Sequence, residues 1–256
     1  MNILKHNRTA WNNEVRKGNR WTIPATREEI DAAKRGDVRI FLTPTKPIPK
    51  DWLGDLPGKK VLCLASGGGQ QGPILAAAGA EVTVFDNSDQ QLRRDEETAA
   101  AFDLKIRTVQ GNMQDLSVFK AESFDMIIHP VSNVFINNVL PVWQACGLVL
   151  KTGQPLLSGF TNPLVYMVDW EKADNTGICQ LKYAIPYDDT KSLSAGELKR
   201  YQEEKIPFEF GHSLTDLIQG QIAAGFHITG FYEDGGEPIL NAFSEVFIAT
   251  RAVKTG

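Results

Sequence analysis

Short apolar runs alternate with segments of helical periodicity between residues 60 and 160. The apolar runs predict five strands, at 60–65, 81–86, 105–111, 124–130 and 154–160. Runs that are apolar on both faces are typical of a parallel sheet covered by helices on each side. The pattern therefore predicts an α/β, doubly wound fold.

The connecting helices carry recognisable start signals. Ser88, with Gln91 three residues later, has the capping-box spacing and predicts a helix over 89–103. Apolar residues at three- and four-residue steps from Val139 to Val149 put one apolar stripe on another helix. A further helix is predicted to begin at Ser213, and two more strands are expected at 227–233 and 245–253.

The segments on either side of this core do not show its regular pattern of strands and helices. Residues 1–57 hold two predicted helices, around 9–16 and 27–34, followed by the proline-rich stretch 43–49. Proline at this density favours an extended surface path, so we expect an extension packed over the main domain, 58–256. Residues 162–210 show no clear strand pattern and contain polar clusters, which predicts an inserted, lid-like segment.

Composition and charge exclude several classes of protein. The chain is 42% apolar and 23% charged, as in ordinary globular proteins. It has 27 basic and 31 acidic residues and no long basic block, so nucleic acid is not an expected partner. The three cysteines and four histidines lack ligand spacing, so no metal is expected. Without a long apolar stretch or an N-terminal apolar region, we expect no membrane contact and a cytoplasmic location.

The richest chemical signal is a glycine-rich turn after the first strand of the core. Residues 61–72 read VLCLASGGGQQG, an apolar run followed by glycines before a helix that begins near Pro73. Glycine lets backbone amides approach a ligand, and the helix N-terminus favours an anionic group. Asp86 ends the next strand, 19 residues after Gly67, where a carboxylate can accept both hydroxyls of a ribose. The combination predicts a nucleoside-binding site.

Two other functions fit part of this signal. Gly67, Gly69 and Gly72 satisfy GxGxxG, and 187–191 and 201–205 have the YxxxK spacing of short-chain dehydrogenases, which would make the protein an NAD(P)-dependent oxidoreductase. The residues within both YxxxK segments are wholly polar, which is typical of solvated turns or helix faces. A non-catalytic nucleoside sensor is the other alternative.

An ordered set of segments resembles the class I S-adenosylmethionine-dependent methyltransferases. Residues 62–69, 84–86, 111–116, 123–128 and 148–153 are similar, in that order, to the family's motifs. Residues 20–24, 65–73 and 129–133 further resemble a bacterial and archaeal subgroup of such enzymes. The resemblance implies a seven-stranded sheet whose last strand is antiparallel, and methyl transfer from S-adenosylmethionine to a small molecule, with S-adenosylhomocysteine as product.

The resemblance also implies the cofactor contacts. The acid of the second motif, Asp86, would hold the ribose, and Asn112 and Met113 would flank adenine. Cys63 and Ala65 stand where the family commonly has an acid and a glycine, so the side chains of Ser66, Gln70 and Gln71 are expected to supply replacement hydrogen bonds. The complete set of expected cofactor-binding residues is Trp21, Ala65, Ser66, Gly67, Gly69, Gln70, Gln71, Asp86, Asn87, Asn112, Met113 and His129.

Methyl transfer from a sulfonium is an in-line displacement, in which alignment contributes more than a general base does. If a base is used, His129 is the candidate, because crevices in open sheets form at the carboxyl ends of strands. A strand-end histidine bonded to backbone is an equally good interpretation. Residues expected on the acceptor side are Asn133, Tyr166, Tyr183, Tyr187 and His212.

Overall fold

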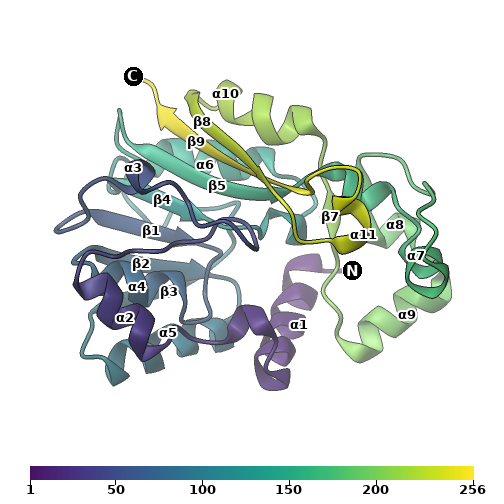
Figure 1. Ribbon diagram of the computed structural model, residues 1–256, viewed down its shortest axis with the longest axis horizontal. Coiled ribbons are helices and arrows are strands. Elements are labelled where there is room, and N and C mark those ends of the chain that lie inside the picture. The colour runs from purple at the N-terminus through teal and green to yellow at the C-terminus, as the bar shows by residue number, and fades with distance from the viewer.

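A seven-stranded sheet forms the centre of the molecule (Figure 1). The structure is a computed structural model that describes the backbone of residues 1–256 and every side chain except that of Pro238. Across the sheet the strands are β3 (Ile106–Gln110), β2 (Glu81–Asp86), β1 (Lys60–Leu64), β4 (Met126–His129), β5 (Pro155–Thr161), β9 (Phe247–Lys254) and β8 (Phe226–Asp234). The first five are parallel, and β9 runs antiparallel to both of its neighbours. The predicted doubly wound, mostly parallel sheet is confirmed.

Both faces of the sheet are covered by apolar contacts, as the unbroken apolar runs predict. Val61 and Cys63 of β1 belong to one core cluster, whereas Leu62 and Leu64 belong to the other. Successive side chains of a strand point to opposite faces, so each strand feeds both clusters. The helices that follow the strands are α4 (Gln71–Ala77), α5 (Asp89–Ala101), α6 (Leu140–Val149), the π-helix η4 (Thr215–Gln219) and α10 (Gly220–Ala223).

Residues 1–57, the predicted extension, precede the first strand of the sheet. It contains α1 (Ile3–Lys17), the 3-10 turn η1 (Arg20–Thr22), α2 (Arg27–Lys34) and α3 (Lys50–Leu53). Helix α1 begins earlier than predicted, because Asn2 caps it by accepting a hydrogen bond from the Lys5 amide. Between α2 and α3 the chain is extended. Ile40, Leu42 and Ile48 of this stretch are buried against one face of the sheet.

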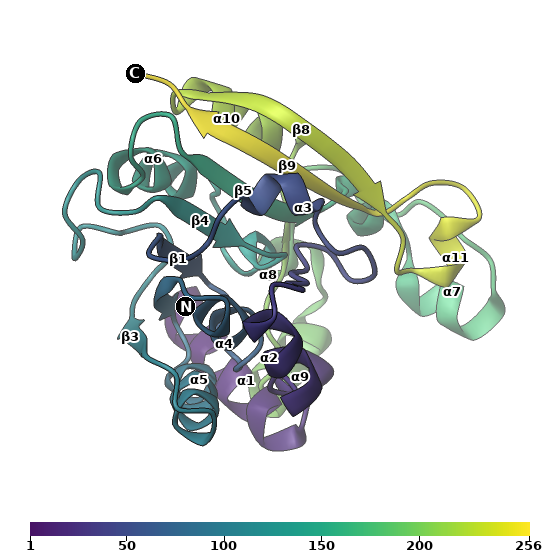
Figure 2. The same cartoon turned by 60° about the vertical axis from the view of Figure 1, so that its left-hand side comes forward.

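Residues 162–210 lie beyond the carboxyl ends of the parallel strands, at the right of Figure 1. This segment and its neighbours contain η2 (Asn133–Phe135), η3 (Pro163–Met167), α7 (Trp170–Thr176), β6 (Tyr187–Asp188), α8 (Asp189–Ser192), α9 (Ala195–Glu204), β7 (Phe210–Gly211) and α11 (Pro238–Asn241). Strands β6 and β7 pair only with each other. Figure 2 shows β8 and β9 as a long ribbon along one edge of the molecule, ending near α11. Among the helices of the described chain, none is both long and apolar enough to cross a membrane.

Candidate active site

A cavity of about 710 Å³ opens at the carboxyl ends of β1, β2 and β4. Strand β1 lies between β2 and β4, so the strand order reverses direction at this point, which is where open α/β sheets form their ligand crevices. The walls come from the β1–α4 loop, the end of β2, the chain after β3, the η2 region, the extension and the inserted segment. The cavity volume lies within the roughly 300–1,000 Å³ typical of small-ligand pockets.

The glycine-rich loop is packed too tightly for side chains. A Cβ atom on Gly67 would lie 2.8 Å from Gln91 Cβ and 3.2 Å from Asp86 Oδ2. Gly69 has a φ of 78°, and a Cβ there would lie 2.7 Å from Thr98 Oγ1 of α5. Gly67 lines the cavity, but Gly69 does not. Gly69 instead packs closely on α5.

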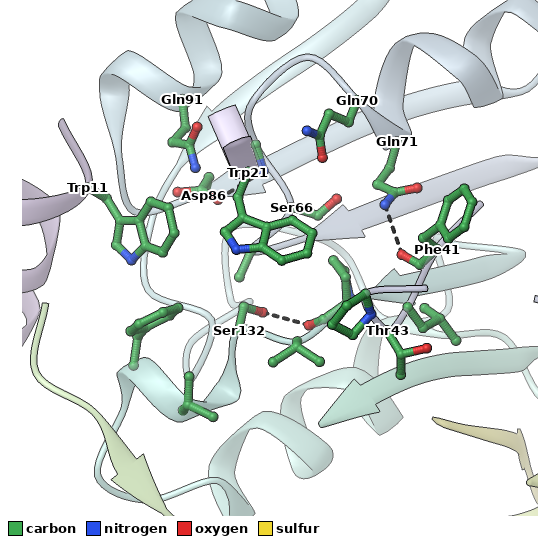
Figure 3. Close-up of a pocket in the computed structure, with 18 of the residues that line it drawn as sticks. Trp11, Trp21, Phe41, Thr43, Ser66, Gln70, Gln71, Asp86, Gln91 and Ser132 are labelled. Atoms are coloured by element: carbon green, nitrogen blue, oxygen red, sulfur yellow. Dashed lines mark hydrogen bonds between the residues drawn. The ribbon is translucent and has the colours of Figure 1, made fainter. Parts of the chain in front are cut away.

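Asp86 ends β2 with its carboxylate at the cavity wall (Figure 3). Its Oδ2 accepts a hydrogen bond from the Gly67 amide at 3.0 Å, and Oδ1 accepts one from the Ser88 amide at 2.8 Å. Burial raises the pKa of this carboxyl, and the backbone amides around it oppose the rise. Each oxygen keeps a further lone pair for a ligand hydroxyl.

Most of the expected cofactor residues do lie at the cavity. Ten of the twelve line the cavity, namely Trp21, Ala65, Ser66, Gly67, Gln70, Gln71, Asp86, Asn87, Asn112 and Met113. The amides of Gln70 and Gln71, however, donate to backbone carbonyls of the extension, at Ile23 (2.8 Å) and Phe41 (2.8 Å). These donors hold the extension against the loop and are not free for a methionine group.

Aromatic side chains of the extension complete the cavity wall (Figure 3). Trp21 is 41% exposed, and the Arg20 guanidinium lies 4.3 Å from the centre of its ring. Trp11, whose aromatic ring is another candidate to close over a ligand, lines the same cavity, and so does Phe41, which was not among the expected residues. The apolar positions at Phe41 and Leu42, just before the prolines, mark a buried stretch, but nothing local in the sequence places it at the cavity.

A buried acid, Asp95, supports the glycine loop and was also missed. It lies on α5 with no exposed surface, and its Oδ2 accepts a hydrogen bond from the Gly68 amide at 2.9 Å. Burial is the main reason that its pKa rises to about 8. The sequence signal that could have revealed Asp95 is its position between Leu92 and Ala99, where a charged residue interrupts the apolar stripe of the helix.

The Asp95→Asn variant is expected to gain stability relative to wild type as the pH rises from about 4 to about 8. In this window the folded chain holds a proton that the unfolded chain, with an ordinary aspartate pKa, has released. The free energy of unfolding of the wild type therefore falls with rising pH, by at most about 1.4 kcal/mol per pH unit from this group, and the fall ends above about pH 8. The variant lacks this dependence. Urea unfolding of both proteins from pH 5 to 9 tests the prediction, and parallel stability curves would contradict it.

The structure does not bring His129 into the cavity. Its side chain is fully buried, and Nδ1 lies 3.0 Å from the carbonyl oxygen of Leu64. The ring meets Trp143 edge-on, with ring centres 6.0 Å apart, within the core on one face of the sheet. Burial lowers its pKa to about 4, so the ring is neutral at physiological pH. The roles considered for His129, as a base and as a cofactor contact, therefore give way to the other interpretation, a strand-end histidine bonded to backbone.

Of the residues expected on the acceptor side, only Tyr166 lines the cavity. Asn133 is buried and donates to the carbonyl of Gly159, while His212 Nε2 lies 2.9 Å from the carbonyl oxygen of Asn133. Tyr183 and Tyr187 pack with Tyr166 in an aromatic cluster. Asn133, His212, Tyr183 and Tyr187 therefore lie behind the residues that line the cavity, and they contact other parts of the protein.

The two YxxxK segments do not form a dehydrogenase site. Tyr187 donates to Asp189 at 2.8 Å, and Lys191 is exposed and paired with Asp188 at 2.7 Å. Lys205 ends α9 in a left-handed conformation at the surface. Neither lysine lines the cavity that contains the glycine loop.

Comparison with known proteins agrees with this geometry. Residues 61–153 match the family described as "Methyltransferase domain". Over 252 residues, covering 98% of each chain, the protein is 51% identical to the uncharacterized methyltransferase YbaJ of Bacillus subtilis. The chain belongs to the class I S-adenosylmethionine-dependent methyltransferases.

Solved structures show the same fold at low sequence identity. An S-adenosylmethionine-dependent methyltransferase from Mesorhizobium loti superposes with a TM-score of 0.59, at 17% identity over 80% of this chain and 95% of that one. Geranyl diphosphate methyltransferase in complex with S-adenosylmethionine gives a TM-score of 0.52, at 12% identity over 80% of this chain and 82% of that one.

Proposed function

We propose that the cavity binds S-adenosylmethionine with its ribose on Asp86 and transfers the methyl group in line to a small molecule held beside Tyr166. The observation that carries the proposal is the carboxylate of Asp86, which faces the cavity with free lone pairs beside the glycine loop. A ribose offers two hydroxyl donors to such a group.

The residues around Asp86 fit the rest of the cofactor. Asn112 and Met113 line the cavity next to it and would flank adenine. The Ser66 hydroxyl is buried without an oxygen or nitrogen partner in the part of the chain that the structure describes, and it lines the cavity at the glycine loop. An unsatisfied buried hydroxyl is costly, so a polar ligand atom at this point would stabilise the loop. The methionine end would lie here.

The bound sulfonium supplies an electrophilic methyl group whose positive charge disappears on transfer. The protein's contribution is to align the acceptor with the carbon–sulfur bond and to keep water out. The extension, 1–57, would cover the cofactor with Trp21, whose ring face can attract a sulfonium. The inserted segment, 162–210, would form the acceptor side through Tyr166.

Calorimetric titration of the full chain tests the cofactor. S-adenosylmethionine and S-adenosylhomocysteine are expected to bind at one site, and NAD and NADP to give no heat of binding, because the relatives of this chain are methyltransferases. A dinucleotide that binds where S-adenosylmethionine does not would overturn the proposal. Release of S-adenosylhomocysteine in a screen of small acceptors then distinguishes an enzyme from a sensor, which would bind the cofactor without turnover.

A further inference from the structure

The acceptor side of the cavity contains a carboxylate that no positive charge of the protein balances. Glu209 lines the cavity next to β7, and one of its oxygens, Oε2, accepts a hydrogen bond from the Tyr166 hydroxyl at 2.8 Å. Among the described residues this is the only hydrogen bond made to the carboxylate. The charged groups that act on it are Asp189 and Glu237, both acidic. Burial above all, and then these two acids, raise the pKa of Glu209 to about 7, against the hydrogen bond from Tyr166.

The position of Glu209 is fixed from behind. Its backbone amide donates to Asp189 Oδ2 at 2.7 Å, and Asp189 also accepts from the Tyr187 hydroxyl. Tyr166 stacks on Tyr187 with ring centres 5.5 Å apart, and a Cβ on Gly211 would lie 2.7 Å from the Tyr166 ring. The tyrosine hydroxyl and the carboxylate are therefore held in place before a ligand arrives, which reduces the entropy lost on binding.

The net charge of the residues that line the cavity also favours a cationic ligand. The cavity's described charged side chains are four carboxylates against two guanidinium groups, from Glu29, Asp86, Glu209, Glu237, Arg20 and Arg39. S-adenosylmethionine carries a sulfonium, an ammonium and a carboxylate, so when all four carboxylates are ionised its net charge of one positive balances only half of this excess. A cationic acceptor would balance the remainder, and an anionic acceptor would add to it.

We propose that the methyl acceptor is an amine that enters as its ammonium form, pairs with Glu209 and lies against the Tyr166 ring. The inference rests on the proposed function. The Glu209 carboxylate takes one proton from the ammonium and frees the nitrogen lone pair. That lone pair forms the new nitrogen–carbon bond as the carbon–sulfur bond breaks, and the bonding electrons stay on sulfur. The products are the N-methylated ammonium and neutral sulfur in S-adenosylhomocysteine, and Glu209 then loses its proton to solvent.

The test compares matched amines and alcohols. Ethylamine with ethanol, and phenethylamine with 2-phenylethanol, are titrated into the full chain saturated with S-adenosylhomocysteine at pH 8, where Glu209 is mostly ionised. At least one amine is expected to bind ten or more times more tightly than its alcohol. The Glu209→Gln variant, which keeps the shape of the side chain and an acceptor for Tyr166, is expected to bring the two affinities within about twofold. Glu204→Gln, on the exposed end of α9, is the matched control and should keep the preference.

The outcomes separate this inference from the proposed function. If S-adenosylhomocysteine does not bind, the proposed function fails. If it binds to both variants and wild type with similar affinity but no amine binds, or the alcohols bind as well, or the preference survives in Glu209→Gln, the amine inference is overturned while the proposed function stands. Similar affinity for S-adenosylhomocysteine also shows that Glu209→Gln is folded.

Discussion

Replacing Asp86 by Asn is expected to weaken binding of S-adenosylmethionine by about 100-fold. The carboxylate would accept two ribose hydroxyls, and hydrogen bonds to a charged group contribute about 1.5–3 kcal/mol each. Asn supplies one acceptor oxygen, and its amide would face either the Gly67 or the Ser88 backbone donor. Calorimetric titration with S-adenosylmethionine measures the loss.

The control for Asp86→Asn is Asp103→Asn. Asp103 follows α5 at the surface with a φ of 53°, a conformation that Asn tolerates well. It is expected to leave both affinity and unfolding temperature unchanged. If Asp86→Asn remains folded and binds S-adenosylmethionine as wild type does, the ribose does not lie on this carboxylate and the proposed orientation of the cofactor is wrong.

Replacing Gly159 by Ala is expected to lower the free energy of unfolding by about 3 kcal/mol. A Cβ on this residue of β5 would lie 2.0 Å from the carbonyl oxygen of Leu42, which is backbone and cannot turn aside. Overpacking of a core costs roughly 1–3 kcal/mol, and a clash between main chains belongs at the upper end. The extended stretch would have to move off the sheet, breaking the 3.1 Å hydrogen bond from the Val131 amide to Leu42.

Urea unfolding measures this effect, with Gly196→Ala as the matched control. Gly196 lies in the first turn of α9, and a Cβ there would meet nothing closer than 4.0 Å, so Ala is expected to be neutral or to stabilise by up to about 1 kcal/mol. Because Leu42 and Thr43 line the cavity, Gly159→Ala should also weaken cofactor binding. Equal stability of the two variants would show that the extension is not held against β5.

The glycine loop, the place of Asp86 at a strand end and the positions of the seven strands along the chain could be predicted because their signals are local. A loop that excludes Cβ atoms requires glycine at fixed positions, and a carboxylate that follows a strand must lie at the sheet's edge. The capping residue Ser88 likewise acts within one helical turn, and its helix begins where the sequence indicates.

The sequence could not show to which face of the sheet the His129 side chain points, and the reason is physical. Its strand reads Met126-Ile127-Ile128-His129 and is buried on both faces, so it lacks the alternation of apolar and polar residues that would show which face each side chain meets. Glu209 and Phe41 escaped prediction for another reason. They are 168 residues apart and meet the cavity only through the tertiary fold, which no local pattern encodes.

The contacts of Gln70 and Gln71 have a consequence for the catalytic cycle. These amides hydrogen-bond the loop that would hold the methyl donor to the N-terminal segment that covers it, at Ile23 and Phe41. If S-adenosylhomocysteine leaves past Ile23 and Phe41, these two hydrogen bonds would have to break before fresh donor could enter, and product release would then limit turnover.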